Sequence, residues 1–281
     1  MAVRDTVGTL RRVLVRELRE EDLDSWQDYG WHDRPDLPRA RDEHAAFREL
    51  LASRGAEVAS ADSPMDANPD GIYTCDPALE SPVGTILLRP GKVGRRVEVP
   101  AMEAALTTVG ETIAGRLTEP ATAEGGDLLW LDEHTLLAGR SYRTNDAALE
   151  QLRALLPGVD VLGFDLPHLT GPGDVWHLRS FLSPLDHDLV VAFAPYLPAR
   201  LMELLVARGM TVLDCPGSEF ATGGTNVLAL APRVALAIEG NDAIRVQMER
   251  AGVEVLTYRG EEISRKGDGG PTCLTRPIDR D

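Results

Sequence analysis

The sequence predicts a single α/β domain over residues 1–281, built from repeated units in a propeller-like array. Three observations support this fold class. Short β-rich runs recur about five times at a spacing of roughly 50 residues. Each unit contains one predicted helix, and glycine and proline, with 26 and 19 residues, punctuate the runs without a long linker. A doubly wound sheet is the alternative, but hairpins are predicted where that fold would need crossovers.

The first unit is predicted by a step from helix to strand near the start of the chain. Residues 44–54 have a helical pattern, Gly55 ends the helix, and residues 56–59 form a strand. The preceding residues 17–44 are charged and rich in Trp, Asp and Arg. We expect this segment to be an irregular part of the surface or a lid.

The second and third units have weaker patterns. Residues 71–74 and 85–88 are apolar runs that we expect to form strands. Residues 127–131 and 135–138 form the next predicted pair of strands, and residues 145–156 have the periodicity of a helix.

The fourth unit has the clearest pattern. Residues 189–193 are predicted to form a strand, and residues 198–208 an amphipathic helix. Gly209 ends the helix, and residues 210–213 form a second strand.

The fifth unit repeats this order. Residues 226–230 and 234–238 are predicted to form a hairpin, and residues 242–251 the following helix. Gly252 ends that helix, and residues 253–257 form the closing strand.

The charge balance excludes several functions. The chain has 29 Lys and Arg against 45 Asp and Glu, a net charge of −16, whereas a nucleic-acid binder needs a basic surplus. No stretch approaches the roughly 20 apolar residues of a membrane span. We therefore expect a cytoplasmic protein with neither nucleic acid nor membrane as a partner. The acidic balance suits a cationic small substrate, and it suits simple solubility equally well.

Familiar signatures for cofactors and metals are absent from the sequence. The chain has no GxGxxG, GxxxxGK[ST], GxSxG or HExxH motif, so we expect no cofactor and no metal. The three cysteines lack the CxxC spacing of a zinc ribbon and predict no disulfide framework. Three of the six histidines are expected at turns or on the surface: His134, His168 and His187.

Three side chains that suit covalent catalysis lie at the edges of three different predicted units. Cys273 follows a glycine-rich turn, His177 precedes an apolar run, and Glu124 opens the tight turn Glu-Gly-Gly-Asp. A thiolate can attack, an imidazole can transfer protons, and a carboxylate can orient the imidazole. Each residue alone is more often structural, and only the set indicates chemistry. Cys215, at a predicted strand end, is expected to be structural.

Four motifs, in this order, resemble those of the guanidino-group-modifying superfamily. That superfamily includes the arginine deiminases, the amidinotransferases and the dimethylarginine dimethylaminohydrolases. The motifs are Glu124-Gly-Gly-Asp, Gly139-Arg-Ser-Tyr-Arg-Thr-Asn, His177-Leu-Arg-Ser and Gly269-Gly-Pro-Thr-Cys-Leu-Thr-Arg-Pro. Together with the loop that begins at Asn68, they span residues 68–277. The resemblance implies a five-bladed α/β propeller of ββαβ units, a pentein, with the active site at its centre.

The resemblance also implies a role for each catalytic candidate. Cys273 matches the nucleophile that attacks the guanidinium carbon. His177 matches the general acid that protonates the departing amine and then activates water. Glu124 matches the carboxylate that orients this histidine and favours its charged form.

The substrate-binding candidates are implied in the same way. Asp76 matches the carboxylate that binds the guanidinium, and Asp70 a substrate-binding acid in the same loop. Arg95 and Arg143 match arginines that hold the substrate's α-carboxylate. Carboxylates at one end and arginines at the other suit an arginine-like ligand, a small-molecule guanidino compound. Ordinary surface pairing is the alternative for the two arginines.

Two departures from the family pattern bear on the substrate. Deiminases usually have His-x-Asp, whereas here Arg179 stands in place of the aspartate. This favours a dimethylargininase-like hydrolase that converts Nω-methylated arginine to citrulline and an alkylamine through a covalent thiouronium. Cys75 stands where relatives often have Arg or Glu. It either reshapes the guanidinium end of the site or is an inert residue pointing away, and we prefer the second interpretation.

Other functions remain open at this point. The alternatives are a deiminase-like or other substituted-guanidine hydrolase, and a propeller protein that binds without catalysis. The sequence also leaves open whether the chain forms a homodimer.

Overall fold

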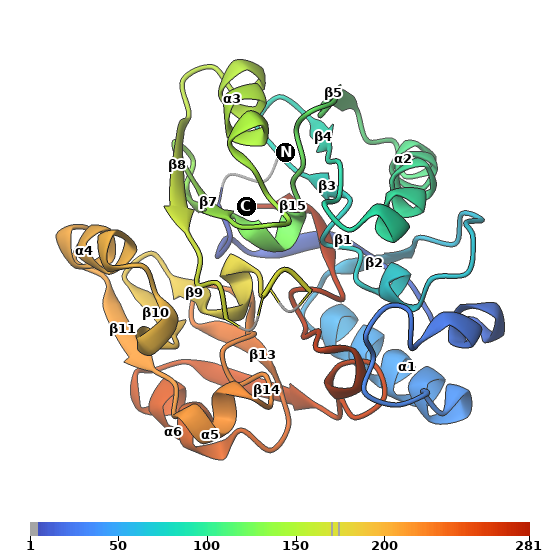
Figure 1. Ribbon diagram of the computed structural model, residues 1–281. Helices are drawn as coiled ribbons and strands as arrows, with labels where there is room; N and C mark the ends of the chain where they lie inside the picture. Colours follow the sequence, from blue (N-terminus) through green and yellow to red (C-terminus); the bar gives the residue numbers. More distant parts are fainter. Residues whose placement is uncertain (1–4, 170, 174) are drawn as a thin grey trace.

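The protein is a five-bladed α/β propeller (Figure 1). The computed structural model describes residues 5–169, 171–173 and 175–281, and over these residues it contains five three-stranded sheets. In each sheet the middle strand pairs antiparallel with one neighbour and parallel with the other. A helix connects the parallel pair and lies at the outside of the ring (Figure 1). The predicted repeat of β-rich units with one helix each is therefore confirmed.

The fifth blade matches the predicted order of elements, and the fourth matches it apart from its first strand, Leu182–Asp186, which was not predicted. Their C-terminal glycines have positive φ values, 71° at Gly209 and 83° at Gly252, as expected where a helix ends. The fourth blade consists of β9 (Leu182–Asp186), β10 (Leu189–Ala192), α4 (Ala199–Ala207) and β11 (Thr211–Asp214). The fifth consists of β12 (Leu228–Ala231), β13 (Val234–Ile238), α6 (Asp242–Arg250) and β14 (Glu254–Tyr258).

The third blade follows the prediction for its first two strands and its helix, but its last strand, Asp160–Asp165, was not predicted. Asn145 begins its helix by accepting a hydrogen bond from the Ala148 amide, at 3.0 Å. The elements are β6 (Leu128–Asp132), β7 (Thr135–Arg140), α3 (Asp146–Leu155) and β8 (Asp160–Asp165).

The second blade corrects one prediction. The expected strand over residues 71–74 is wrong, because Pro69–Ile72 forms a short 3₁₀ helix, η2. The carbonyl oxygens of Asp70 and Tyr73 accept hydrogen bonds from the buried guanidinium of Arg95, which holds this loop out of the sheet. The blade contains β3 (Ala78–Leu79), β4 (Thr85–Leu87), α2 (Glu98–Thr108) and β5 (Ile113–Arg116).

The first blade joins both ends of the chain, which the sequence analysis did not predict. Its strands β1 (Leu10–Val15) and β15 (Arg276–Arg280) pair antiparallel, and β1 pairs parallel with β2 (Glu57–Ser60). Because first and last strands share a sheet, the ring of blades closes. Residues 1–4 lie outside the described residues.

Helix α1 (Leu37–Ser53) is longer than predicted. The prediction that residues 17–44 are irregular throughout is therefore wrong from residue 37 onward. Asp36 accepts a hydrogen bond from the Arg39 amide, at 3.1 Å, and Pro38 stands in the first turn, a combination that starts helices.

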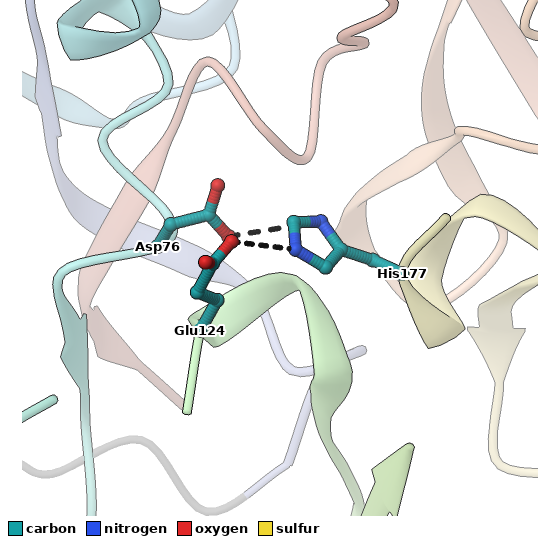
Figure 2. Close-up of side chains that lie close together, drawn as sticks. All are labelled: Asp76, Glu124 and His177. Carbon is teal, nitrogen blue, oxygen red and sulfur yellow. Dashed lines mark hydrogen bonds and ion pairs between the residues drawn. The ribbon is translucent and has the colours of Figure 1, made fainter. Parts of the chain in front are cut away.

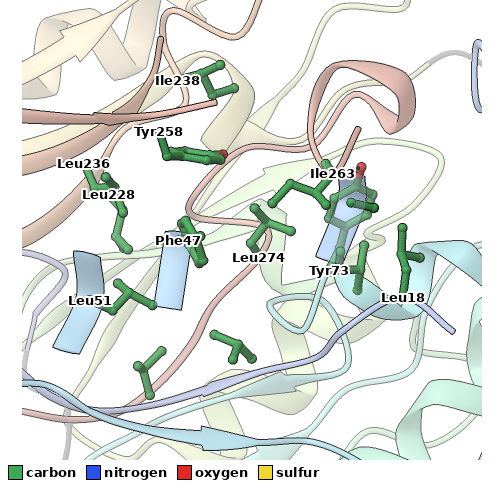
Figure 3. Packing of buried hydrophobic residues seen from close by; sticks show 14 of the residues in the cluster. Leu18, Phe47, Leu51, Tyr73, Leu228, Leu236, Ile238, Tyr258, Ile263 and Leu274 are labelled. Carbon is green, nitrogen blue, oxygen red and sulfur yellow. Dashed lines mark hydrogen bonds between the residues drawn. The ribbon is translucent and has the colours of Figure 1, made fainter. Parts of the chain in front are cut away.

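The core consists of apolar clusters between neighbouring blades. One cluster joins α1 and β1 to β12 and β13 through side chains that include Phe47, Leu228 and Leu236 (Figure 3). Leu274 is 1% exposed in this cluster, and Cys273 packs partly against it. The core therefore anchors the turn that carries the predicted nucleophile. The helices of the described residues are all too short or too polar to cross a lipid bilayer.

Short helices lie in the connections between these elements and contribute to the centre of the ring. They are η1 (Glu20–Ser25), η2, η3 (Val93–Val97), η4 (Gly125–Asp127), η5 (Leu178–Ser180), η6 (Ala194–Tyr196), α5 (Gly217–Phe220) and η7 (Arg265–Gly267).

Candidate active site

One cavity of about 210 Å³ brings together connections from several blades. Six of the seven predicted site residues line it, and they are Asp70, Asp76, Arg95, Arg143, His177 and Cys273. The seventh, Glu124, is fully buried and contacts His177 and Arg143. The structure therefore brings all seven predicted residues into one site.

Glu124 and His177 form a direct pair between two blades. The Nε2 atom of His177 lies 3.0 Å from Oε2 of Glu124 (Figure 2). Each residue immediately precedes a 3₁₀ helix, η4 after Glu124 and η5 after His177. A Cβ atom at Gly126 would lie 2.2 Å from Nδ1 of His177, so a side chain at that position would displace the imidazole. This contact explains why the turn after Glu124 needs glycine.

Asp127 holds the same two loops together. Its carboxylate accepts hydrogen bonds from the Leu178 amide, at 3.1 Å, and from the Thr144 hydroxyl, at 2.6 Å. Burial raises the pKa of Asp127 to about 6, although the neighbouring His177 acts in the opposite direction. Asp127 therefore positions His177 through the backbone of the next residue. Asp127 is the last residue of the Glu-Gly-Gly-Asp motif, and this position is the signal that could have identified it from the sequence.

The carboxylates beside His177 are held in their ionised form. Burial opposes ionisation of Glu124, but Arg143 and His177 outweigh it and hold its pKa well below the usual range. Asp76 is buried as well, and His177 and Arg95 lower its pKa. One oxygen of Asp76 also accepts a hydrogen bond from the Gly126 amide, at 2.8 Å. Two anionic groups therefore remain charged around one imidazole.

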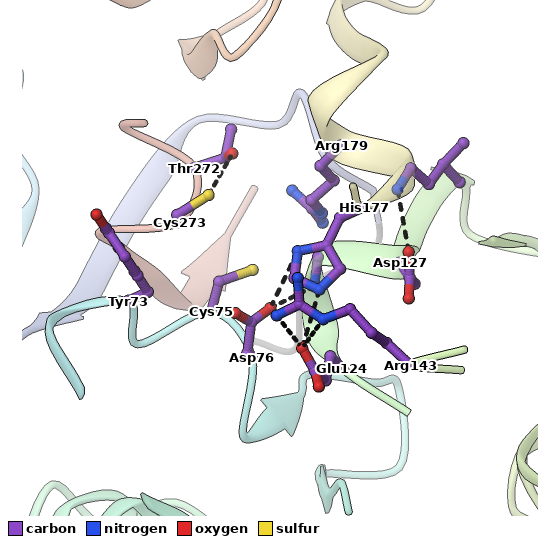
Figure 4. A network of polar contacts seen from close by, with 12 residues as sticks. Tyr73, Cys75, Asp76, Glu124, Asp127, Arg143, His177, Arg179, Thr272 and Cys273 are labelled. Atoms are coloured by element: carbon purple, nitrogen blue, oxygen red, sulfur yellow. Dashed lines mark hydrogen bonds and ion pairs between the residues drawn. The ribbon is translucent and has the colours of Figure 1, made fainter. Parts of the chain in front are cut away.

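Asn226 and Thr272 hold the turn that presents Cys273. Figure 4 shows Thr272 beside Cys273 in this turn. The side-chain amide of Asn226 lies 3.2 Å from the Cys273 sulfur, and its oxygen accepts hydrogen bonds from Thr272. A Cβ atom at Gly270 would lie 2.3 Å from Cγ of Asn226, so the turn depends on glycine there. The thiol is partly exposed. The role of Asn226 was missed, because no motif marks it.

The electrostatic surroundings of Cys273 favour the neutral thiol in this state. Burial raises its pKa, and the negative charge of Asp76 raises it further. A cation that neutralises Asp76 would remove this second cause. Cys273 is therefore a weak nucleophile while the cavity holds no cation. The acidic side chains of the cavity wall, Asp76 among them, attract cations.

The two predicted carboxylate-binding arginines already contact protein groups. Arg95 is 1% exposed, donates to Glu98 at 2.7 and 2.8 Å, and pairs with Asp76. Arg143 donates to Glu124 through Nε at 2.7 Å. Both arginines are therefore paired with carboxylates, as the alternative of ordinary pairing expects, but inside the site: Arg95 is buried, and the side chain of Arg143 is 14% exposed. A contact between Arg95 and a substrate carboxylate would require these pairs to break.

The predicted lid segment forms part of the cavity wall. Tyr29 and Gly30 line the cavity, and the Tyr29 hydroxyl donates to the Gly94 carbonyl at 3.1 Å. The indole N–H of Trp31 donates to Asp70 at 2.9 Å. Residues 29–31 are thus tied to the loops that carry the substrate-binding candidates.

Asp76, Glu124 and His177 also form the donor set that could hold a metal ion. Their ligand atoms lie within 4.8 Å of one another. Arg95 and Arg143 contact the same two carboxylates, so guanidinium groups already balance their charge. This arrangement suits proton transfer better than metal binding, because a metal ion would have to displace the arginines.

Cys75 and Arg179, the two residues that depart from the family pattern, are not among the described residues that line the cavity. Cys75 is 2% exposed, and burial raises its pKa to about 12, so it is a neutral thiol. This agrees with the interpretation of Cys75 as an inert residue. Arg179 is buried and donates to the Leu128 carbonyl at 3.0 Å. No second carboxylate therefore enters the cavity at this position.

The sequence is similar to those of guanidine-modifying enzymes. The arginine deiminase family matches residues 194–280. An arginine deiminase of Mycoplasma capricolum is 31% identical over an alignment of 195 positions that covers 57% of this chain and 47% of that protein, so the chain spans about half its length. A dimethylarginine dimethylaminohydrolase of Streptomyces coelicolor is 29% identical over 74% of this chain and 79% of that protein.

Solved structures share the fold. A serine variant of dimethylarginine dimethylaminohydrolase from Pseudomonas aeruginosa, complexed with citrulline, is 22% identical and has a TM-score of 0.78, covering 95% of this chain and 98% of that one. An amidinotransferase from Microseira wollei is 16% identical and has a TM-score of 0.73, covering 99% of this chain and 97% of that one.

Proposed function

The chain belongs to the guanidino-group-modifying superfamily, and from this premise we propose that it hydrolyses a guanidino C–N bond with Cys273 as the nucleophile. The observation that supports this proposal is the single cavity lined by Cys273, His177 and Asp76, in which Glu124 is paired with His177. A nucleophile, a proton carrier and an anion for the guanidinium are the groups that the reaction needs.

The reaction proceeds through a covalent intermediate. The guanidinium of the substrate lies against Asp76, which favours the thiolate of Cys273. The thiolate adds to the guanidinium carbon, His177 gives a proton to the leaving nitrogen, and the C–N bond breaks. The resulting S-alkylthiouronium is attacked by a water molecule that gives its proton to His177. As the C–S bond breaks, the remaining hydroxyl proton passes to the released amine or to solvent, which leaves a ureido product and restores the thiolate.

The substrate that we propose is an Nω-methylated arginine, which yields citrulline and an alkylamine. A substituted nitrogen needs fewer hydrogen bonds than an unsubstituted one, and Arg179 stands where a deiminase has a carboxylate. Apolar side chains from Val175, Trp176 and Phe220 also line the cavity and suit methyl groups. Arginine deiminase activity is the second candidate, favoured by the match of residues 194–280 to that family.

A comparison of two substrates separates the candidates. The purified protein is offered asymmetric dimethylarginine and arginine side by side, and amine and citrulline are measured. We expect dimethylamine and citrulline from the methylated substrate and no ammonia from arginine. Ammonia from arginine would assign the protein to the deiminases. Inactivity on both substrates would contradict the proposal.

Replacing Arg143 with alanine should weaken substrate binding. A charged hydrogen bond is worth about 1.5–3 kcal/mol, so we expect KM to rise about 10- to 150-fold. Steady-state kinetics check this, with Arg140→Ala as the matched control, because Arg140 pairs with Asp146 and Asp165 on the surface. An unchanged KM in Arg143→Ala would show that this arginine does not hold the substrate.

A further inference from the structure

Among the described residues, Asn226 makes the shortest side-chain hydrogen bond to the sulfur of Cys273. Its amide nitrogen, Nδ2, lies 3.2 Å from Sγ, whereas the Thr272 hydroxyl lies 4.0 Å from the same atom. Asn226 is 6% exposed and lines the cavity together with Cys273. Asn226 stands just before β12 of the fifth blade, and Cys273 just before β15 of the first. The closed ring therefore brings a side chain of one blade to the nucleophile of another.

The other end of the Asn226 amide fixes its orientation. Its Oδ1 atom accepts hydrogen bonds from the Thr272 backbone N–H, at 3.1 Å, and from the Thr272 hydroxyl, at 2.6 Å. A backbone N–H can only donate, so the atom that faces it must be the oxygen of the amide and not its nitrogen. Nδ2 therefore faces Cys273 as a donor, and the residue that precedes the nucleophile holds it there.

A donor at this position stabilises the thiolate more than the thiol. A neutral sulfur is a weak acceptor, whereas a hydrogen bond to a charged group is roughly twice as strong as a neutral one. In the proposed reaction the sulfur is an anion twice, before it attacks the guanidinium carbon and after the C–S bond breaks. The amide of Asn226 is already in place for both stages, so no reorganisation is needed when the charge appears.

The titratable side chains around the sulfur do not provide this stabilisation in the free protein. Asp76 is negative and opposes ionisation of Cys273. The ring nitrogens of His177 face carboxylates, with Nε2 at 3.0 Å from Glu124 and Nδ1 at 3.9 Å from Asp76. Three further groups near the sulfur are neutral at neutral pH because burial raises their pKa, and they are Cys75, Tyr73 and Tyr258. The thiolate therefore depends on neutral hydrogen-bond donors.

We propose that Asn226 is a catalytic residue that activates Cys273 by donating a hydrogen bond to its thiolate. Holding the turn is then only part of its role. Thr272 acts through Asn226 and is a positioning residue, because it fixes which end of the amide meets the sulfur. The two reaction steps that use this donor rest on the proposed function, but its effect on the thiol can be measured without turnover.

The rate of iodoacetamide labelling at Cys273 tests the proposal. Asn226→Asp keeps the shape of the side chain and an oxygen for Thr272, but it replaces the donor with a second oxygen. Losing a hydrogen bond to a charged group should raise the pKa of the thiol by about 1–2 pH units. A thiolate of higher pKa is also more nucleophilic, which offsets about half of this loss, so labelling at pH 8 should slow about 3- to 15-fold. Asn226→Ala removes the donor without adding a charge and should slow labelling as well.

Asn145→Asp is the matched control and should label at the wild-type rate, because Asn145 begins α3 and lies outside the cavity lining. A residue that only held the turn would have the opposite effect, since a loosened turn exposes the thiol and speeds its labelling. Cys215 is buried, so its labelling in the same digest reports unfolding, and the variant in which it stays unlabelled decides. Unchanged or faster labelling of Cys273 in that variant would overturn the proposal.

Failure of this proposal and failure of the proposed function give different results. Slower labelling in the Asn226 variants, with no amine released by the wild-type protein from either substrate, would contradict the proposed function and leave the role of Asn226 standing. Amine release by the wild-type protein, with unchanged labelling in the Asn226 variants, would do the reverse.

Discussion

Replacing Cys273 with serine should reduce turnover by at least about 10³-fold, because an alcohol at this position ionises far less readily than a thiol. The side chain is held by Asn226 at 3.2 Å, a contact that a serine oxygen can also accept. The loss should therefore reflect the nucleophile and not the turn. Amine release under substrate saturation is the measurement, and Cys215→Ser is the control. Cys215 is buried among apolar residues and does not line the cavity.

The pH dependence of Cys273 alkylation provides a second readout of the same assignment. Burial and Asp76 raise the pKa of this thiol, so the thiolate fraction of the free protein grows only at alkaline pH. We expect the rate of iodoacetamide labelling at Cys273, followed by peptide mass spectrometry, to rise with pH beyond the range of an ordinary thiol. Full turnover in Cys273→Ser would contradict the assignment of the nucleophile, and labelling that is fastest at neutral pH would contradict the raised pKa of this thiol.

The parts of the fold that sequence predicts are those governed by local physics. Helices that end at Gly209 and Gly252 need a positive φ at that residue, and the pattern of glycine after an amphipathic run reveals it. The short helix at Pro69–Ile72 was missed because Arg95, more than 20 residues later, binds its carbonyl oxygens. The pairing of β1 with β15 has no local signal, since it joins the two ends of the chain.

The residues of the site divide in the same way, into those with a local sequence signal and those without one. Glu124, His177 and Cys273 stand in glycine-rich or turn motifs, and two of those glycines are needed because a Cβ would collide with His177 or Asn226. Asn226 stands in no motif, and its role follows from a partner that lies far away in sequence, Cys273. The depth at which Arg95 is buried also depends on partners from several loops. Motifs therefore identify the groups that do chemistry and the candidates that bind the substrate, while the group that holds the turn of the nucleophile emerges only from the folded chain.

Replacing His177 with alanine should lower kcat about 10²- to 10⁴-fold, the usual contribution of a positioned acid or base. His177 serves two steps in the proposed reaction, protonation of the leaving nitrogen and activation of water. With an amine leaving group the first step fails, so no adduct should accumulate on Cys273. His168→Ala is the matched control, because that histidine is exposed and contacts Tyr142. Retention of both the rate and its pH profile would remove His177 from the mechanism.

A substrate whose leaving group departs without a proton separates the two steps. S-Methyl-L-thiocitrulline releases methylthiolate, which needs no acid, so Cys273 of His177→Ala should still displace it. Water attack on the resulting thiouronium then lacks its base, and the adduct should persist long enough to appear in the intact mass of the protein. If the variant turned this substrate over at the wild-type rate, His177 would not activate water. If the variant formed no adduct, its loss of activity would come from an impaired nucleophile or from weaker substrate binding. Proton transfer would then have to be assigned to another group next to Glu124.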